Sequence, residues 1–263
     1  MTTTASLRLG AYGQRVAAWI VANVPPARTV LLCGSVAAGV ADDRSDVDLV
    51  VLCDEPVTRA WELDELQDPR LNVTFHTRQT LQNHYQRDWS YLAYLDQCAV
   101  VIAGDPTARA WLTRPRPARD VTGRQIEGFA DELRDSRRGY ERLIREGVPA
   151  DEADAGALHD IYRQSRRAVI LALAGENAHA WRRAEAFPAL AALDPQHAEL
   201  VHRLAALEPY WRARHRDDHA ALHDARQPDV DASFHDACTL MTALADRFLR
   251  HRGEISRTVA SAP

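Results

Sequence analysis

Two carboxylates, Asp46 and Asp48, stand one residue apart in the segment SDVDLVVLC. Side chains alternate along a strand, so both aspartates would project from one face while Val47 and Leu49 project from the other. Two carboxylates on one face repel each other unless positive charge lies between them. In phosphoryl chemistry that charge is commonly a pair of divalent ions about 3.5–4 Å apart. The pair therefore predicts a metal site with Asp46 and Asp48 as ligands.

A loop that could hold phosphate precedes the aspartates. The apolar run 30–33 suits a strand buried on both faces, and it ends abruptly at Gly34-Ser35. Glycine lets backbone approach a ligand closely, and the serine hydroxyl with neighbouring N–H groups can hold phosphate oxygens. A second serine, Ser45, opens the strand that carries the aspartates. We predict Gly34, Ser35 and Ser45 as nucleotide-binding residues; the alternative is a turn followed by an aspartate-capped strand.

The combination of these elements resembles a known signature. Gly34-Ser35, then Asp46 eleven positions after Ser35, then Asp-x-Asp in an apolar strand is similar to the DNA polymerase β-like nucleotidyltransferases. The segments GSVAAG and SDVDLVV most resemble those of the small stand-alone members, including the aminoglycoside adenylyltransferases. The resemblance implies attack of an acceptor oxygen on the α-phosphate of a nucleoside triphosphate, with loss of pyrophosphate. It also implies two Mg²⁺ ions held by Asp46 and Asp48.

The next strand departs from that family. Its members usually carry a third carboxylate there, as metal ligand or general base, but this chain has Asn72 in the strand LNVTFH. An amide cannot accept the acceptor's proton at neutral pH, although its carbonyl oxygen can ligate a metal weakly. His76 shares the predicted face of Asn72 and is one substitute base; the alternatives are a histidine bonded to its neighbours and an acid from the helical region. Asn72 and His76 join Asp46 and Asp48 as catalytic candidates.

Arginine must supply any positive charge for a triphosphate. All 32 basic residues are arginine, which excludes a lysine-containing Walker loop. Arg167 precedes LALAG at a spacing that resembles the second-domain phosphate segment of the aminoglycoside enzymes, and Arg182-Arg183 follow it. We predict Arg167, Arg182 and Arg183 as nucleotide-binding, with solvated helix faces as the alternative.

Three histidines recur every four residues at His215, His219 and His223. Histidines at this spacing on a helix can hold zinc. With no glutamate between them and no second ligand motif, a solvated polar face is the favoured interpretation.

Composition narrows the class of protein. The chain has 263 residues, 46% hydrophobic and 26% charged, as in ordinary globular proteins. A net charge of −5 argues against nucleic acid as partner. The four cysteines show no metal or disulfide spacing, no apolar run could span a bilayer, and the start does not resemble a signal peptide. We expect a cytoplasmic protein without membrane contact.

The predicted elements form two domains. Strands are predicted near 30–33, 46–53, 71–76 and 98–103, with helices over 12–23, 61–66, 79–88, 91–95 and 107–112. A Pro115/Pro117 break follows, and beyond it helices are predicted over 125–146, 154–174, 195–216 with a break at Pro209, and 230–250. The fold class is therefore α+β: residues 1–117 form a nucleotidyltransferase-like domain with a mixed sheet, and 118–263 form a helical bundle.

The sequence thus predicts a nucleotidyltransferase that transfers a nucleoside monophosphate, AMP by the resemblance, to a hydroxyl of a small molecule. Two alternatives stay open. One is a nucleotide-binding or regulatory protein of the same fold that has lost turnover through Asn72. The other is transfer to a macromolecular acceptor, a protein side chain or an RNA end, with RNA disfavoured by the net charge.

Overall fold

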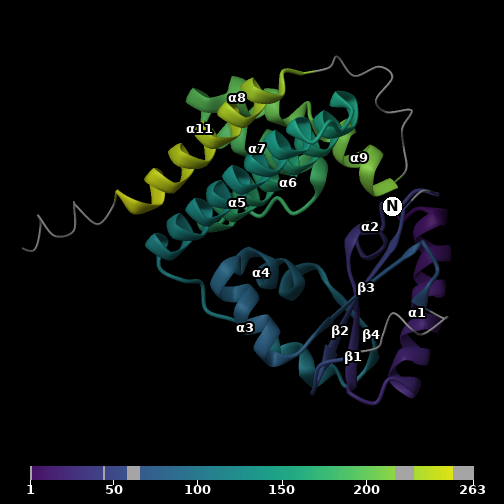
Figure 1. The fold of residues 1–263 in the computed structure, drawn as a ribbon. Helices are drawn as coiled ribbons and strands as arrows, with labels where there is room; N and C mark the ends of the chain where they lie inside the picture. Colours follow the sequence, from purple (N-terminus) through teal and green to yellow (C-terminus); the bar gives the residue numbers. More distant parts are fainter. Residues whose placement is uncertain (1, 44, 58–65, 217–227, 251–263) are drawn as a thin grey trace, which may run out of the picture. The chain divides into compact units, whose positions relative to one another are not determined.

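A computed structural model describes residues 2–43, 45–57, 66–216 and 228–250 of the chain (Figure 1). It divides into two compact units, Met1–Arg116 and Pro117–Pro263. Each unit buries its own set of apolar side chains. The helix predicted around Trp61–Leu66 falls almost wholly outside the described residues.

The first unit is built on a mixed four-stranded sheet. Its strands are β1 (Ala27–Leu32), β2 (Val47–Cys53), β3 (Leu71–His76) and β4 (Val100–Gly104), in the order β3-β2-β1-β4. β2 and β3 run parallel, whereas β1 is antiparallel to both of its neighbours. This sheet, together with the helical second unit, confirms the predicted α+β class.

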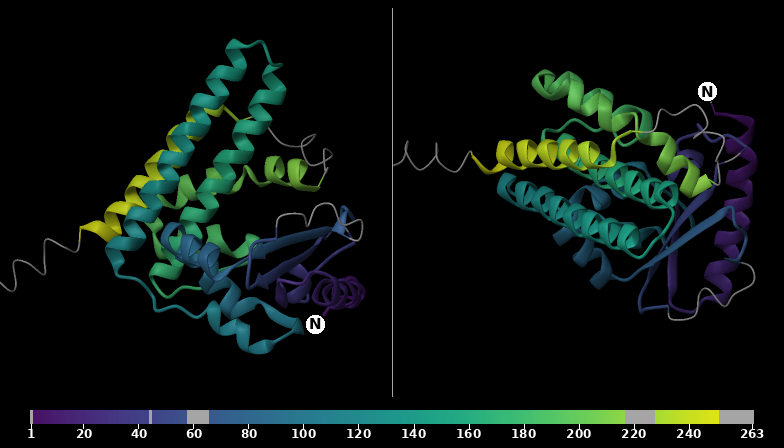
Figure 2. Two further views of the ribbon diagram at one scale, coloured as in Figure 1. Left: turned by 60° about the horizontal axis from the view of Figure 1, so that its bottom comes forward. Right: turned by 45° about the horizontal axis from the view of Figure 1, so that its top comes forward.

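Alternation along β1 and β2 gives the sheet two apolar faces. Val47, Leu49 and Val51 pack with the helix α1 (Thr4–Asn23) on one face. On the other face, Val50 and Leu52 pack with residues of α3 (Arg78–Arg87), α4 (Trp89–Cys98) and the short 3₁₀ helix η3 (Pro106–Trp111). Figure 2 shows α1 on one side of the strands and α3 and α4 on the other. Full burial of each such aliphatic side chain contributes roughly 1.5–3 kcal/mol to folding.

Several element boundaries differ from the predicted ones: β1, α1 and the two long helices of the second unit each begin earlier than predicted, and β4 begins later. Two of these differences have a clear cause. α1 begins at Thr4 rather than near Tyr12, because Thr3 caps it by accepting the Ser6 N–H and buried Leu9 anchors its first turns. β4 begins at Val100 rather than Cys98, because α4 continues through Cys98. Both predictions failed at an end of an element, where apolar periodicity carries little information.

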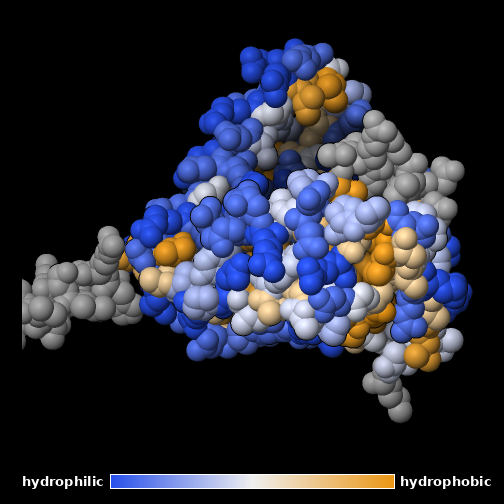
Figure 3. Space-filling view, turned by 90° about the horizontal axis from the view of Figure 1, so that it is seen from below, coloured by the Kyte–Doolittle hydropathy of each residue, from blue (hydrophilic) through white to orange (hydrophobic). Residues whose placement is uncertain are grey.

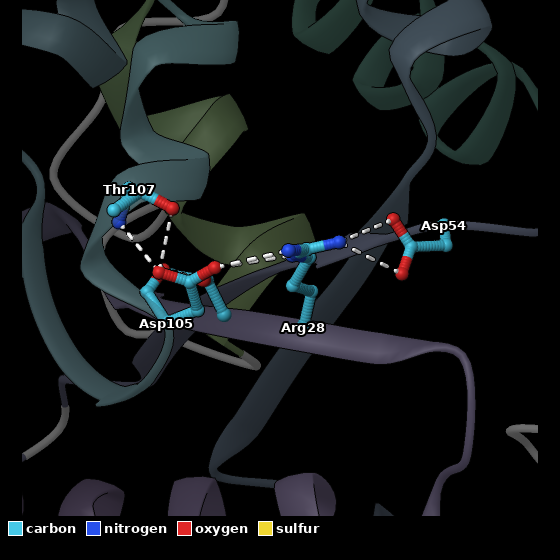
Figure 4. Close-up of polar contacts among 5 residues, drawn as sticks. Arg28, Asp54, Asp105 and Thr107 are labelled. Carbon is cyan, nitrogen blue, oxygen red and sulfur yellow. Dashed lines mark hydrogen bonds and ion pairs between the residues drawn. The ribbon is translucent and has the colours of Figure 1, made fainter.

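An arginine ties the ends of three strands together (Figure 4). Arg28, near the start of β1, donates hydrogen bonds to Asp54 after β2 at 3.3 Å and to Asp105 after β4 at 3.2 Å. Asp105 also accepts hydrogen bonds from the Thr107 N–H and hydroxyl, which with Arg28 lower the pKa of its carboxyl. The cluster therefore closes the sheet at the ends opposite Gly34 and Asp48.

The second unit is helical, as predicted. Two long helices, α5 (Arg119–Arg145) and α6 (Ala150–Gly175), pack with α11 (Val230–Leu249). Close approach is possible because Gly175 on α6 leaves room for the Phe248 ring. Pro209 lies in the first turn of α9, where its missing N–H costs no hydrogen bond. The other helices are α7 (Arg183–Leu193), η4 (Pro195–His197), α8 (Ala198–Ala205) and α9 (Glu208–Arg216).

The molecular surface is mixed. On the face drawn in Figure 3 hydrophilic residues predominate, and hydrophobic residues form small separate patches. Arginines of α5 pair with acids of the same helix, as in Arg134 with Asp131 and Arg137 with Glu141. Within the described ranges, no helix combines the length and the apolar character needed to cross a bilayer.

Candidate active site

The parallel pairing of β2 and β3 places Asn72 beside Asp48. The two residues are register partners, and the Asn72 side-chain Nδ2 donates a hydrogen bond to Asp48 Oδ1 at 2.9 Å. Asn72 is exposed and Asp48 half-buried, so the pair lies at an accessible place near the start of β2 and β3. The position predicted for a third carboxylate therefore carries a hydrogen-bond donor to a predicted metal ligand.

Gly34 lies against the same carboxylate. It has a positive φ of 66° and begins the short helix α2 (Gly34–Ala37) directly after β1. A methyl group in place of its hydrogen would overlap Asp48 Oδ2. The glycine is predicted to let a phosphate approach the backbone. The structure shows a second reason why residue 34 has no side chain, which is its contact with the Asp48 carboxylate.

Tyr94 on α4 completes this group, and it is a residue that the sequence analysis missed. The Gly34 N–H donates a hydrogen bond to the Tyr94 hydroxyl at 2.8 Å. Burial raises the pKa of Tyr94 to about 12, so the phenol stays neutral at physiological pH. Its signal in the sequence was weak: a tyrosine sixty positions away has no pattern that links it to the loop.

The two predicted serines have different surroundings. Ser35 is the second residue of α2 and half-buried. Ser45 is buried, and its hydroxyl donates to Asp42 Oδ1 at 2.8 Å while accepting the Asp42 N–H at 3.0 Å. Ser45 thus closes the turn that leads into β2, which is a structural use of its hydroxyl.

The carboxylates of Asp46 and Asp48 are ligands of the type that Mg²⁺ prefers in proteins. Asp46 immediately precedes β2, two residues before Asp48, and its side chain is half-buried. Mg²⁺ is commonly held by one or two carboxylates and completed by phosphate oxygens and water. Over the part of the chain that the structure describes, no group of three or more His, Cys, Asp or Glu side chains could hold a metal. A magnesium site at Asp46 and Asp48 therefore stays a prediction.

His76 is the predicted substitute base, and the register places it far along β3. Its partner in β2 is Leu52, four positions beyond Asp48, which corresponds to about 13 Å of strand. Its Nε2 lies 3.0 Å from the Tyr91 hydroxyl, and its ring contacts His84 edge-on. Burial, aided by His84, lowers the pKa of His76 to about 4. This placement argues against direct proton transfer between His76 and an acceptor held at Asp48.

The predicted arginines belong to the second unit. Arg167 donates to Glu132 at 3.1 Å and to Gln164 at 3.0 Å, and its guanidinium lies over the Phe129 ring. Arg182 makes an exposed ion pair with Glu185, and Arg183 begins α7 with its side chain outside the described part. A nucleotide-binding role for these residues stays a prediction.

The histidine series of the sequence analysis lies beyond what the structure describes. His219 and His223 fall in the range 217–227, and the side chain of His215 is likewise not described.

Comparison with known proteins identifies one region. Residues 22–93 match the family model of the nucleotidyltransferase domain. The matched region includes Gly34, Ser35, Asp46, Asp48 and Asn72. No curated protein matches the chain. Nucleotidyl transfer is therefore the general chemistry that the first unit supports.

Proposed function

We propose that the protein is a Mg²⁺-dependent nucleotidyltransferase that moves AMP from ATP to a hydroxyl of a small molecule. The acceptor oxygen forms a bond to the α-phosphorus, the bond from that phosphorus to the bridging oxygen breaks, and pyrophosphate leaves. The acceptor's proton is lost to a base or to solvent. The subtype and the acceptor class rest on the resemblance to the aminoglycoside adenylyltransferases, within a region that matches the nucleotidyltransferase domain.

One observation carries the proposal. Asp48 lies near the start of β2 against Gly34, and Asp46 precedes it by two residues. We infer that the two carboxylates face the same way. In such an arrangement the carboxylates hold Mg²⁺, and the loop offers Ser35 to the phosphates. When bound, Mg²⁺ neutralises the negative charge of the phosphate oxygens.

Asn72 limits how the proton is removed. Its amide has no basic atom at neutral pH, and its Nδ2 already donates a hydrogen bond to Asp48 Oδ1. The residue can orient the Asp48 carboxylate, and its Oδ1 can accept a hydrogen bond from an acceptor hydroxyl. Proton transfer then falls to another group, to solvent or to the phosphates themselves.

Asn72 also supports a second candidate function. A protein that keeps the loop and the aspartates but lacks a base could bind a nucleotide with Mg²⁺ and not turn it over. Binding without pyrophosphate release would then serve a regulatory role. Transfer to a protein side chain is a further alternative, because nothing in the described first unit fixes the size of the acceptor.

A scan of the four triphosphates tests these candidates. Binding is measured by calorimetry with and without Mg²⁺, and pyrophosphate release is measured with hydroxylated acceptors such as amino sugars and with a protein acceptor. We expect Mg²⁺-dependent binding of ATP and acceptor-dependent release of pyrophosphate. Binding without release under all conditions would favour the regulatory candidate, and absence of binding would exclude all three.

A further inference from the structure

Gly34 is held from two sides by residues far from it in the sequence. The Asp48 carboxylate lies against its Cα, and the Tyr94 hydroxyl accepts its N–H at 2.8 Å. The preceding residue, Cys33, donates its N–H to the Asp48 carbonyl at 2.9 Å. The backbone at the start of the loop, the metal-ligand candidate and the tyrosine therefore form one connected group.

The tyrosine itself is fixed by the core. Leu92 and Leu95, on either side of it along α4, are 1% and 0% exposed, and both belong to the apolar cluster beneath the sheet. The Tyr94 ring packs against the same cluster, while its hydroxyl reaches the loop. An acceptor mounted on an anchored helix restrains the Gly34 peptide far better than water could, because it cannot reorient freely.

We propose that Tyr94 is a positioning residue of the candidate active site, which sets the Gly34 turn and through it the Asp48 carboxylate. Gly34 adopts a positive φ, but glycine populates negative φ about as readily. A contact from outside the loop is therefore needed to hold this conformation. The Tyr94 hydroxyl supplies this contact and anchors the turn. With the Gly34 N–H given to Tyr94, the phosphate contacts of the loop fall to Ser35.

This inference rests on the proposed function, and the variant Tyr94→Phe tests it with Mn²⁺ as the probe. Phenylalanine keeps the packed ring and removes only the acceptor. Free Mn²⁺ is measured by electron paramagnetic resonance, first with protein alone and then with ATP. We expect Mn²⁺ binding about fivefold weaker than in the wild type, the loss that one hydrogen bond typically causes. In steady-state assays KM for ATP should rise by a similar factor, with kcat changed less because bound substrate restores the loop.

Tyr85→Phe is the matched control. Tyr85 packs against the same apolar cluster, and its hydroxyl donates to the Pro115 carbonyl at 2.7 Å, so the variant also loses one tyrosine hydrogen bond. It should leave Mn²⁺ affinity unchanged. Equal Mn²⁺ affinity in Tyr94→Phe and in the wild type would overturn the inference alone. A wild type that binds neither Mn²⁺ nor ATP would overturn the proposed function and the inference with it.

A second measurement applies if Tyr94→Phe does not fold. Hydrogen exchange of the Gly34 amide is followed by NMR in the wild type without metal. Protection of this amide supports the anchor, and exchange at the rate of an unprotected amide overturns it.

Discussion

The side-chain amide of Asn72 donates a hydrogen bond to Asp48 Oδ1 at 2.9 Å, across the parallel strands β2 and β3. A carboxylate at position 72 would repel Asp48 in the absence of a cation, whereas the amide attracts it. The Asn72 amide thus offsets part of the negative charge of Asp48 without a metal ion. The same contact makes the site less negative, so cation affinity is expected to be lower than with three acids.

Loss of the Asp48 charge should abolish transfer. Asp48→Asn removes a predicted metal ligand and leaves an amide of nearly equal size, so the fold should persist. We expect a fall in kcat/KM of roughly 10²-fold or more, with Mn²⁺ binding lost as well. Circular dichroism checks the fold. Asp54→Asn, which changes an aspartate just past the far end of β2 beside Arg28, is the control and should keep full activity. Retained activity in Asp48→Asn would remove the metal role.

Gly34→Ala should be destabilising as well as inactivating. The residue has φ 66°, which costs an L-residue roughly 1–2 kcal/mol, and the new methyl group would displace the Asp48 carboxylate. We expect urea unfolding to show at least that loss and calorimetry to show no triphosphate binding. Gly139→Ala on α5 is the contrasting variant, because nothing lies within 4 Å of its added methyl group and alanine favours helix. Gly139→Ala should stabilise the chain. If Gly34→Ala binds triphosphate with unchanged affinity, Gly34 serves only to form the turn.

Buried His76 should make stability fall in mild acid. Burial lowers its pKa to about 4, whereas the unfolded chain has an ordinary value near 6.5. Below pH about 6.5 the unfolded state therefore binds a proton that the folded state does not. The contribution of His76 is complete above that pH and is lost as pH falls toward 4, by roughly 3 kcal/mol in total. Urea unfolding at pH 7.5 and pH 5 measures it, and His76→Gln should show a smaller difference between the two. An equal difference in both proteins would contradict the assignment.

Local pattern was enough to predict that the four strands form and how side chains alternate along β2 and β3, although not where every strand begins. β3 runs from Leu71 to His76 as its period-two alternation indicates, and Val47 and Leu49 share one face of β2 as predicted. The structure adds that this face packs against α1. Both predictions depend on neighbours in sequence. α7 shows the limit of the method. Pro188 lies inside this helix and its apolar residues are spread around it, so no one-sided pattern marks it.

The contacts that build the candidate site could not be predicted in the same way. Alternation predicts which face of its own strand Asp48 or Asn72 occupies. Only the register of β2 and β3 shows that the two residues are partners. The same register separates His76 from Asn72, although both share a predicted face. Tyr94 meets Gly34 because α4 folds back over the sheet, a relation between elements that no local pattern encodes.

Replacing Asn72 by an acid should make the stability of the chain depend on Mg²⁺. Asn72→Asp puts two carboxylates at the 2.9 Å contact, so without metal the variant should be less stable, by about 1 kcal/mol at this exposed position. Saturating Mg²⁺ should restore that stability, and Mn²⁺ should bind more tightly than to the wild type. The longer Asn72→Glu offers a base as well, and general-base catalysis is typically worth roughly 10²–10⁴-fold.

Asn72→Ala separates charge from the lost hydrogen bond. It removes the same contact without adding a carboxylate, so its loss of stability relative to the wild type should not shrink when Mg²⁺ is added. Thermal unfolding with EDTA and with Mg²⁺ measures both variants. Pyrophosphate release then decides between the two functions. If Asn72→Glu turns over ATP when the wild type only binds it, the chain is a nucleotide-binding protein that has lost its base. If the acid destroys an activity that the wild type has, Asn72 is a working part of an altered site, because its amide then holds Asp48 in the geometry that transfer requires.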